Sequence, residues 1–339
     1  MKKIFSLLFY LAITISNAQN NDLDALLAAG VDDAQRFAND YLAPGTNGLM
    51  HSMNAGWFNT ANAKPLGGFE ISIIANASSV KDEYKTFLMN TDLYNNVQFV
   101  QGPSAQMVAS ALGHNETDIL FEVEYQVPNS SVVLREQITL PTGIAEANIN
   151  VLPTAFIQGA LGLSKGIEIK ARFIPKINTE DVDLSMYGAG LQFEMTKWLP
   201  ADKLLPVAVS GLVAYTHLDG SYDITNSSGV AGENQRIENA TNTWLFQLIA
   251  STKLPVINFY GGLGFIKGKS ESDLLGTYRS SSTAIIPFNE IDPFSVSSEV
   301  SSVRGTLGFK LKLGFFRLNG EYHLSEFNAF SVGVNFGFR

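Results

Sequence analysis

Apolar and polar residues alternate through most of the chain. In the last segment Phe330, Val332, Val334, Phe336 and Phe338 occupy every second position, with small or polar residues between them. The same period recurs near 67–77, 147–163, 167–173, 187–196, 206–218, 242–252, 256–269, 306–313 and 316–324. A period of two is that of a β-strand with one apolar face. The pattern therefore predicts an all-β fold.

Alternation alone fits either a β-sandwich or a membrane barrel. A sandwich would show long charged side chains on its polar face and breaks after about five or six residues. Here many segments run for ten residues or more, the length that crosses a bilayer at a tilt. Their polar face often carries Gly, Ala, Ser or Asn, which suits a crowded lumen. The sequence favours an antiparallel transmembrane β-barrel over 67–339.

Turn positions predict the strand register. A two-residue turn at Gly314-Phe315 would place Lys312 opposite Arg317. A three-residue turn at 164–166 would place Leu163 opposite Ile167, with Gly166 in a left-handed conformation, and one at 325–327 would place His323 opposite Ala329. Each turn keeps the apolar side chains on one face, as strand pairing requires.

The connections alternate in length. Those near 164–166, 199–205, 252–255 and 314 are short, whereas the set near 175–182, 219–240, 270–298 and 325–327 contains the two longest. Short periplasmic turns and long outer loops are typical of outer-membrane barrels. We count ten strands, and 119–125 and 132–139 could supply two more. Both termini on one side require an even number, so we predict about 12 strands, with 10 to 14 as the range.

The N-terminal part has a different period. Apolar residues recur at spacings of three and four over 21–42, at Leu23, Leu26, Leu27, Val31, Ala34, Phe37 and Tyr41. This stripe predicts a helix. Asn21 or Asp22 could cap its start, Gly30 could divide it, and Pro44-Gly45 should end it. We predict irregular structure over 45–66 and a plug of residues 19–66 inside the barrel.

The first 18 residues are typical of a secretory signal peptide. Met1-Lys2-Lys3 is basic, an apolar run follows to about residue 15, and Ser16-Asn17-Ala18 forms a small-x-small site. A buried strand or an anchor is the alternative, but the run is too short for a membrane helix. The chain contains no Cys, which excludes a diacylated lipoprotein and a disulfide-stapled domain.

Charge excludes one class of partner. The net charge is -9, and removal of Lys2 and Lys3 makes it -11 (-9 - 2). Nucleic-acid phosphates need clustered Lys and Arg, so we expect no nucleic-acid partner. With 16% charged residues, 23 Phe and 29 Gly, the chain is either a packed β protein or a barrel that faces lipid.

The C-terminal strand carries a second motif. Ser331, Gly333, Phe336 and Phe338 fill a polar-x-Gly-x-x-aromatic-x-aromatic pattern, followed by Arg339. This pattern resembles the terminal signal that the outer-membrane assembly machinery recognises. An ordinary amphipathic edge strand is the alternative.

The N-terminal part resembles the FadL-type long-chain fatty-acid transporters. In that family a helical plug and a motif of Asn-Pro-Ala type precede the first strand. Here the helical stretch 21–42 is followed by Asn59-Thr60-Ala61, with Thr60 at the position of Pro. The whole chain, including Leu152-Pro153-Thr154, resembles an uncharacterised outer-membrane barrel family of Bacteroidota. The resemblance implies a fold and an outer-membrane location, without naming a substrate.

The sequence gives no sign of catalysis. The four His residues lack metal-ligand spacing, and neither His-Glu-x-x-His nor Gly-x-Ser-x-Gly occurs. We therefore expect no enzyme, metal or cofactor. Gly188-Ala189-Gly190 and the glycines of 261–264 lack the following helix of a nucleotide site and indicate close packing. The segment 219–223 could bind calcium, although a solvated turn is the simpler interpretation.

Polar residues on the proposed inner face are the candidate lumen lining. They are Glu168, Lys170, Arg172, Glu194, Lys310, Lys312, Arg317, Glu321 and His323. They could line a pore or hold the plug, or they could simply pair within a packed interior. Lys312 opposite Arg317 would repel unless Glu321 or a plug carboxylate lies near. Aromatic residues near strand ends fit interfacial girdles, namely Tyr187, Trp198, Tyr215, Trp244, Tyr260 and Tyr322.

Three hypotheses follow for function. The first is a monomeric outer-membrane barrel, in contact with outer-membrane lipid, for passive uptake or binding of a small hydrophobic molecule. The second is a structural or surface-binding barrel that acts through the loops 219–240 and 270–298. The third is a soluble secreted β protein. Swelling of proteoliposomes separates the first two, and extraction only by detergent separates both from the third.

Overall fold

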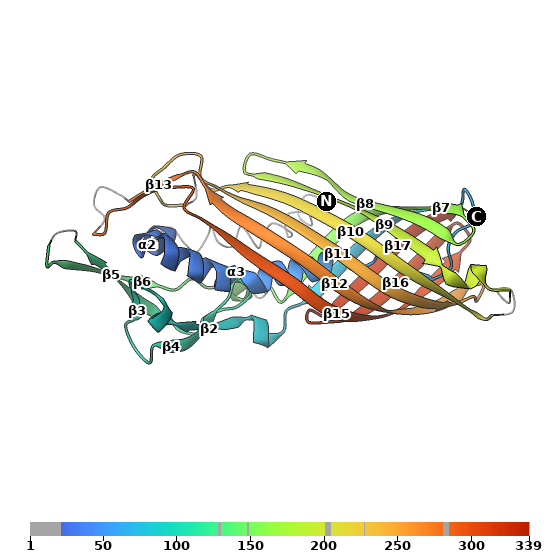
Figure 1. The fold of residues 1–339 in the computed structure, drawn as a ribbon, viewed down its shortest axis with the longest axis horizontal. Coiled ribbons are helices and arrows are strands. Elements are labelled where there is room, and N and C mark those ends of the chain that lie inside the picture. Colours follow the sequence, from blue (N-terminus) through green and yellow to red (C-terminus); the bar gives the residue numbers. More distant parts are fainter. Residues whose placement is uncertain are drawn as a thin grey trace.

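The computed structural model shows an elongated molecule with a barrel at one end and helices and small sheets at the other (Figure 1). It describes residues 22–127, 130–147, 149–200, 205–226, 228–280 and 285–338. The predicted signal peptide and Arg339 lie outside these residues.

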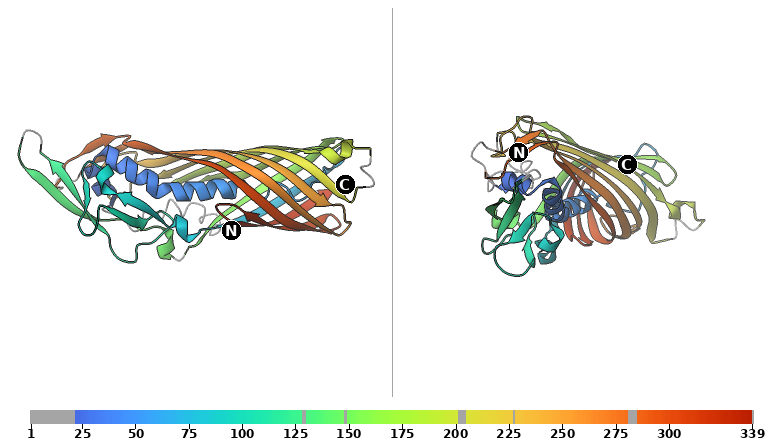
Figure 2. Two further views of the ribbon diagram at one scale, coloured as in Figure 1. Left: turned by 60° about the horizontal axis from the view of Figure 1, so that its bottom comes forward. Right: turned by 60° about the vertical axis from the view of Figure 1, so that its left-hand side comes forward.

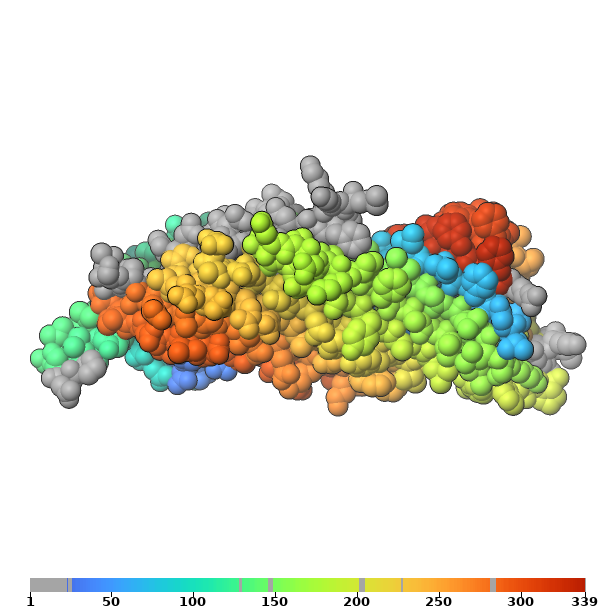
Figure 3. Space-filling model, turned by 90° about the horizontal axis from the view of Figure 1, so that it is seen from above, coloured from blue at the N-terminus to red at the C-terminus, as the bar shows by residue number. Residues whose placement is uncertain are grey.

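Ten antiparallel strands form one closed barrel. They are β1 (Phe69–Ser79), β7 (Val151–Ser164), β8 (Ile167–Asn178), β9 (Val182–Glu194), β10 (Val207–Asp223), β11 (Arg236–Thr252), β12 (Ile257–Leu275), β15 (Phe294–Leu313), β16 (Phe316–Leu324) and β17 (Ala329–Phe338). β1 closes the barrel by pairing with β7 and β17. Figure 3 shows β1 in light blue between green β7 and red β17. The ten periodic segments are the ten barrel strands, at the low end of the predicted range.

The ambiguous stretch after β1 is an insert, residues 80–150, outside the barrel. It contains β2 (Thr86–Asn90), β3 (Val97–Phe99), β4 (Ala105–Ala109), β5 (Leu120–Gln126) and β6 (Val133–Thr139) in two small sheets, with 3-10 turns at Asp82–Tyr84, Thr91–Leu93 and Ile144–Ala147. Segments 119–125 and 132–139 are strands, but their expected place in the barrel is wrong. They have seven residues each, fewer than the roughly nine that cross a bilayer.

From residue 22 onward two helices precede the barrel, α2 (Asp22–Ala28) and α3 (Val31–Met53). Gly30, at φ 99°, separates them, as the sequence suggested. The predicted end at Pro44-Gly45 is wrong, and the irregular structure predicted over 45–66 is wrong for residues 45–53, which are helical. Pro44 lacks an N–H, so the carbonyl of Asp40 loses its usual donor four residues on. Thr46 Oγ1 adds bonds to the next carbonyls, those of Leu42 and Ala43, at 3.3 and 3.0 Å. Tertiary enclosure then stabilises the remaining turns, because Gly48 packs against Leu152 and Phe327.

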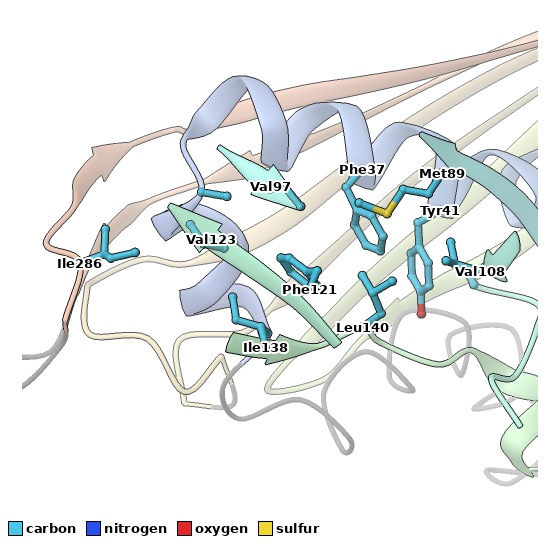
Figure 4. Close-up of a cluster of buried hydrophobic side chains, with 12 residues drawn as sticks. Phe37, Tyr41, Met89, Val97, Val108, Phe121, Val123, Ile138, Leu140 and Ile286 are labelled. Atoms are coloured by element: carbon cyan, nitrogen blue, oxygen red, sulfur yellow. The ribbon is translucent and has the colours of Figure 1, made fainter. Parts of the chain in front are cut away.

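One face of α3 joins the insert to the barrel mouth. Phe37 and Tyr41 point from the helix toward Phe121, Val123 and neighbouring apolar residues of the insert (Figure 4). At its other end α3 enters the barrel, where Met50 belongs to a core cluster with strand residues such as Leu212, Leu245 and Ile266. The apolar face of α3 therefore packs first against the insert and then, toward its C-terminal end, against the barrel wall.

The barrel wall is uneven in height. β16, β17 and β1 have 9, 10 and 11 residues, whereas β12 and β15 have 19 and 20. The tall strands run beside α3 beyond the short ones, and the insert lies on the helix's other side (Figure 2). The other elements of the described segments are β13 (Thr277–Arg279), β14 (Asn289–Ile291) and a 3-10 turn at Met195–Trp198.

The two ends of the barrel differ as the loop lengths predicted. The turn end carries the connections at 165–166, 253–256 and 314–315, and the loop end carries α2, the insert and the long connections. Lys312 pairs with Arg317 and His323 with Ala329, which confirms both registers. The expected pairing of Leu163 with Ile167 is wrong, since a bulge brings Ser164 opposite Ile167.

Candidate functional site

The outer surface of the barrel is an apolar belt. Its exposed side chains include Ile71, Phe193, Leu248, Leu263, Leu307 and Phe336. Along β12 the belt runs from Ile257 to Phe265, and Lys267 and Lys269 follow. At a rise of about 3.3 Å per residue and a tilt of about 40°, this span is roughly 20 Å high, near the roughly 25 Å band of membrane barrels.

The predicted aromatic girdle is only partly on this surface. Tyr187, Trp198, Trp244 and Tyr322 are between 44% and 56% exposed, and Tyr215 is half-buried. Tyr260 is only 4% exposed, so its expected place in the girdle is wrong. Tyr260 lies two positions after Asn258 on β12, on the same inward face, and it packs edge-on against Phe58.

All the candidate lumen residues lie on the inner face. Seven of them are at most 6% exposed, namely Glu168, Lys170, Arg172, Glu194, Lys310, Glu321 and His323. Lys312 and Arg317 are half-buried near the turn end. The structure brings these residues together in separate groups around the plug segment, defined here as residues 54–66.

Glu70 is the centre of the first group. Its carboxylate lies 2.9 Å from Lys310 Nζ, 2.5 Å from Arg317 Nη1 and 3.8 Å from Lys64 Nζ. Asn59 of the plug segment donates to it at 2.8 Å. The repulsion between Lys312 and Arg317 is therefore relieved by a strand carboxylate and not by Glu321. Sequence reasoning missed Glu70, although its position between Phe69 and Ile71 marks it as inward.

Two further carboxylates bind the plug main chain. Glu168 accepts from the amide N–H of Lys64 at 2.9 Å and pairs with Lys64 Nζ at 3.3 Å and Lys170 Nζ at 2.6 Å. Glu194 accepts from the amide N–H of Ala63 at 2.7 Å. The interior is therefore a paired network that includes the plug.

Neutral side chains hold the plug between these contacts. Ala61 donates its N–H to Ser251 Oγ at 3.0 Å, and its carbonyl accepts from Ser210 Oγ. The carbonyl of Thr60 accepts from Gln192 Nε2 at 3.1 Å. These contacts come from β9, β10 and β11, so the plug is fastened around the wall.

Arg172 contacts the plug where α3 ends. Its Nη1 donates to the carbonyls of Met53 and Ala55 at 2.9 and 3.0 Å. Its guanidinium carbon lies 3.6 Å from the centre of the Trp57 ring. A Cβ on Gly190 would lie 3.0 Å from that ring, and one on Gly188 would lie 3.1 Å from it. Gly188 and Gly190 therefore mark a close approach of the plug to the wall, as the sequence indicated.

Another group of inward polar residues lies on β15 and β16 and does not bind the plug directly. Glu321 accepts from Asn319 at 3.0 Å. His323 contacts Thr306 and Ser331, each at 2.9 Å. Arg304, 3% exposed, has no hydrogen-bond partner for Nε or Nη1 among the described residues.

An apolar cavity of about 110 Å³ opens at the loop end. It lies between the helices and the ends of the tall strands. Its lining residues are Leu23, Leu26, Phe37, Ala38, Tyr41, Leu42, Pro141, Ile224, Ile237, Ser272, Asp273, Leu274, Phe294 and Val296. Asp273 is the one charged residue among them.

The wall also has a seam between β7 and β8. Their pairing ends at Ile157 and Phe173. Beyond that point β7 continues to pair with β1 only, and β8 pairs with β9 across an irregularity next to Pro175. An apolar cluster lies behind the seam, made of Met53, Ile74, Phe156, Ile174, Leu184, Met186 and Leu218.

No group of metal-ligating residues occurs in the described part of the chain. No helix among the described residues is long and apolar enough to span a membrane. The segment 219–223 forms the end of β10, where Asp219 contacts His217 at 2.7 Å. The expected turn there is therefore wrong.

A family model matches residues 1–338, a family of unknown function (DUF6588). The chain belongs to this family. No curated protein matches the sequence.

Solved outer-membrane proteins are similar in architecture. An outer membrane channel from Pseudomonas putida F1 is 12% identical, with a TM-score of 0.40, over 84% of this chain and 99% of that one. The translocator domain of the autotransporter NalP from Neisseria meningitidis is 12% identical, with a TM-score of 0.28, over 81% and 89%. At such scores neither similarity extends to function, and the FadL resemblance and the Bacteroidota origin stay predictions.

The C-terminal motif occupies the closing strand. Ser331 faces inward against His323, whereas Phe336 and Phe338 are 39% and 54% exposed. Phe338 stacks on Phe69 of β1, with ring centres 5.2 Å apart. Recognition by the assembly machinery stays a prediction.

Proposed function

We propose that this DUF6588 protein is an outer-membrane barrel that binds a small, uncharged hydrophobic molecule at its outer end for passive uptake. It would be exported by means of its signal peptide and act as a monomer, binding and releasing the molecule without catalysing a reaction. The apolar cavity at the loop end is the observation that carries the proposal. It offers an apolar environment directly above a lumen that is otherwise charged.

The apolar belt supports the membrane location. A soluble protein rarely exposes a contiguous apolar patch larger than a few hundred Å². Here outward Phe, Leu, Ile and Val residues are exposed on strand after strand. Each would be stabilised by contact with lipid tails, by about 25 cal/mol per Å² removed from water. This argues against the soluble alternative.

The cavity limits the size and charge of the ligand. At about 110 Å³ it is smaller than an engineered cavity of about 150 Å³ that binds benzene. Its enclosed part holds no more than one ring or a short alkyl chain. A ligand carboxylate would face Asp273 without a lining cation, and burial of an unpaired charge is costly. An uncharged ligand is therefore favoured over a fatty-acid anion.

The onward path is supported by the seam rather than by the lumen. Residues 59–64 and the surrounding ion pairs fill the lumen toward the turn end. The seam between β7 and β8 is backed by apolar side chains. A molecule that leaves there would enter the membrane without crossing the charged network.

A matched pair of probes tests the binding site. We expect benzyl alcohol to bind the detergent-solubilised barrel at least tenfold more tightly than benzoate, measured by calorimetry. Ala38→Phe should fill the cavity and abolish binding, and Asp273→Asn should strengthen only benzoate. Equal affinities, or binding that survives Ala38→Phe, would contradict the proposed site.

The filled lumen favours a second candidate, a structural or surface-binding barrel without transport. In it the insert and the long connections at the loop end would bind an outside partner. Proteoliposomes separate the two candidates. Uptake of benzyl alcohol faster than into protein-free vesicles supports the first, and an unchanged rate with failed binding supports the second.

A further inference from the structure

Charged wall side chains hold the plug main chain at two points. At the first point α3 ends, and the last carbonyls of a helix have no partner within it. Arg172 donates to the carbonyl of Met53, the last residue of α3, and to that of Ala55, two residues beyond it, at 2.9 and 3.0 Å. At the second point Glu194 and Glu168 accept from the amides of Ala63 and Lys64, at 2.7 and 2.9 Å.

These contacts are stronger than those between them. A hydrogen bond with one ionised partner is roughly twice as strong as a neutral one. Arg172, Glu168 and Glu194 are each at most 1% exposed, so water does not compete for them. Thr60 and Ala61, which lie between the two points, have neutral partners. Charged partners therefore hold the plug main chain at its two ends, and between them Asn59 is held only through its side chain, by Glu70 and Lys310 at 2.8 Å each.

The chain path determines how this plug can move. It is continuous with α3 at one end and with β1 at the other, so it cannot leave the barrel as a detached unit. Opening must displace residues 56–62 within the lumen while both ends stay tethered. Main-chain contacts at the ends oppose such a displacement whatever the plug side chains are.

We infer that Arg172, Glu168 and Glu194 form a clamp that keeps the lumen closed, and that release of either clamped point loosens residues 56–62, which the Asn59 side chain alone then holds to charged wall residues. The inference goes beyond the proposed function, because the clamp controls the lumen and the proposed ligand leaves through the seam. The inference concerns how readily the plug becomes exposed to solvent, which can be measured without any ligand.

Two buried residues of the same barrel serve as matched controls. Glu321 is a buried lumen carboxylate whose partners are wall residues, Asn319 and His323 of its own strand and Tyr260 of β12. Arg304 is a buried lumen guanidinium on β15 without a partner for two of its nitrogens among the described residues. Each resembles a clamp residue in charge and burial but lacks its contact with the plug.

The chain contains no Cys, so a single cysteine at Ala61 reports plug opening. Ala61 is fully buried in the plug. In the A61C background we expect maleimide to label E194A and R172A about tenfold faster or more than the parent, since a charged hydrogen bond is lost. E321A and R304A should stay within about threefold of the parent. E194Q keeps an acceptor oxygen without the charge and should label at an intermediate rate.

Heat-modifiable migration on a gel selects the variants that fold. If folded clamp variants and controls label at the same rate, the clamp is overturned, and E194Q provides this comparison should E194A not fold. Fast labelling in clamp variants with no binding of benzyl alcohol would leave the clamp standing and reject the proposed ligand. Slow labelling with normal binding would do the reverse.

Discussion

At the scale of single residues, missing side chains matter as much as present ones. Trp57 lies against Gly188 and Gly190 of β9, and a Cβ at either position would approach its ring to within about 3.1 Å. Trp57 in turn stacks on Arg172. Glycine in the wall therefore makes room for the bulkiest side chain of the plug.

Gly190→Leu should destabilise the folded barrel. The added side chain must displace the Trp57 ring, and overpacking of this kind costs about 1–3 kcal/mol. The measurement is the midpoint of urea unfolding in detergent. Gly159→Leu is the control, because a Cβ there has no heavy atom within 4 Å. A similar loss in both variants would mean that packing against Trp57 is not the cause.

At the scale of elements, each strand has two unlike faces. On β11, Trp244, Phe246 and Leu248 are 45–53% exposed, whereas Thr243, Leu245 and Gln247, which alternate with them, are at most 6% exposed. The outward side chains lie within the apolar belt, and Ala240 lies beyond it, opposite Glu271. The position along a strand therefore decides what a charge would cost.

Leu248→Arg should weaken the barrel in a bilayer far more than Ala240→Arg. An arginine on the lipid face costs about 2–4 kcal/mol near the midplane and about 0–1 kcal/mol near the interface. Unfolding by denaturant from liposomes measures the difference. Equal costs at the two positions would show that this surface does not face hydrocarbon.

At the scale of the whole molecule, the chain threads its own barrel. α2 lies at the loop end, the plug runs through the lumen, and β1 begins beside the C-terminal strand at the turn end. The insert then returns to the loop end. The proposed location makes the loop end the cell surface.

Labelling of intact cells should therefore distinguish the two ends. A cysteine in place of exposed Ser130, in the insert, should react with an impermeant maleimide, and one in place of exposed Lys165, at the turn end, should react only after the outer membrane is opened. The reverse pattern would refute the assigned orientation. Reaction of both in intact cells would refute the membrane location.

The sequence determined the barrel strands because each one records its environment in its own alternation. One face meets an apolar surrounding and the other a polar interior, so the ten segments, the pairing of Lys312 with Arg317 and the inward candidates were all readable from local pattern. The same logic placed Arg172, Glu168 and Glu194 inside, without showing what they contact.

Only the tertiary structure decided the rest, because it depends on contacts between distant segments. Enclosure between wall and insert extends α3 past Pro44, against its local signal. β5 and β6 alternate like barrel strands, yet they lie outside because the insert offers them nearer partners. Glu70, rather than Glu321, relieves the repulsion between Lys312 and Arg317. The amides of Ala63 and Lys64 donate to carboxylates more than a hundred residues away in the sequence. No local period encodes which segments meet across a closed barrel.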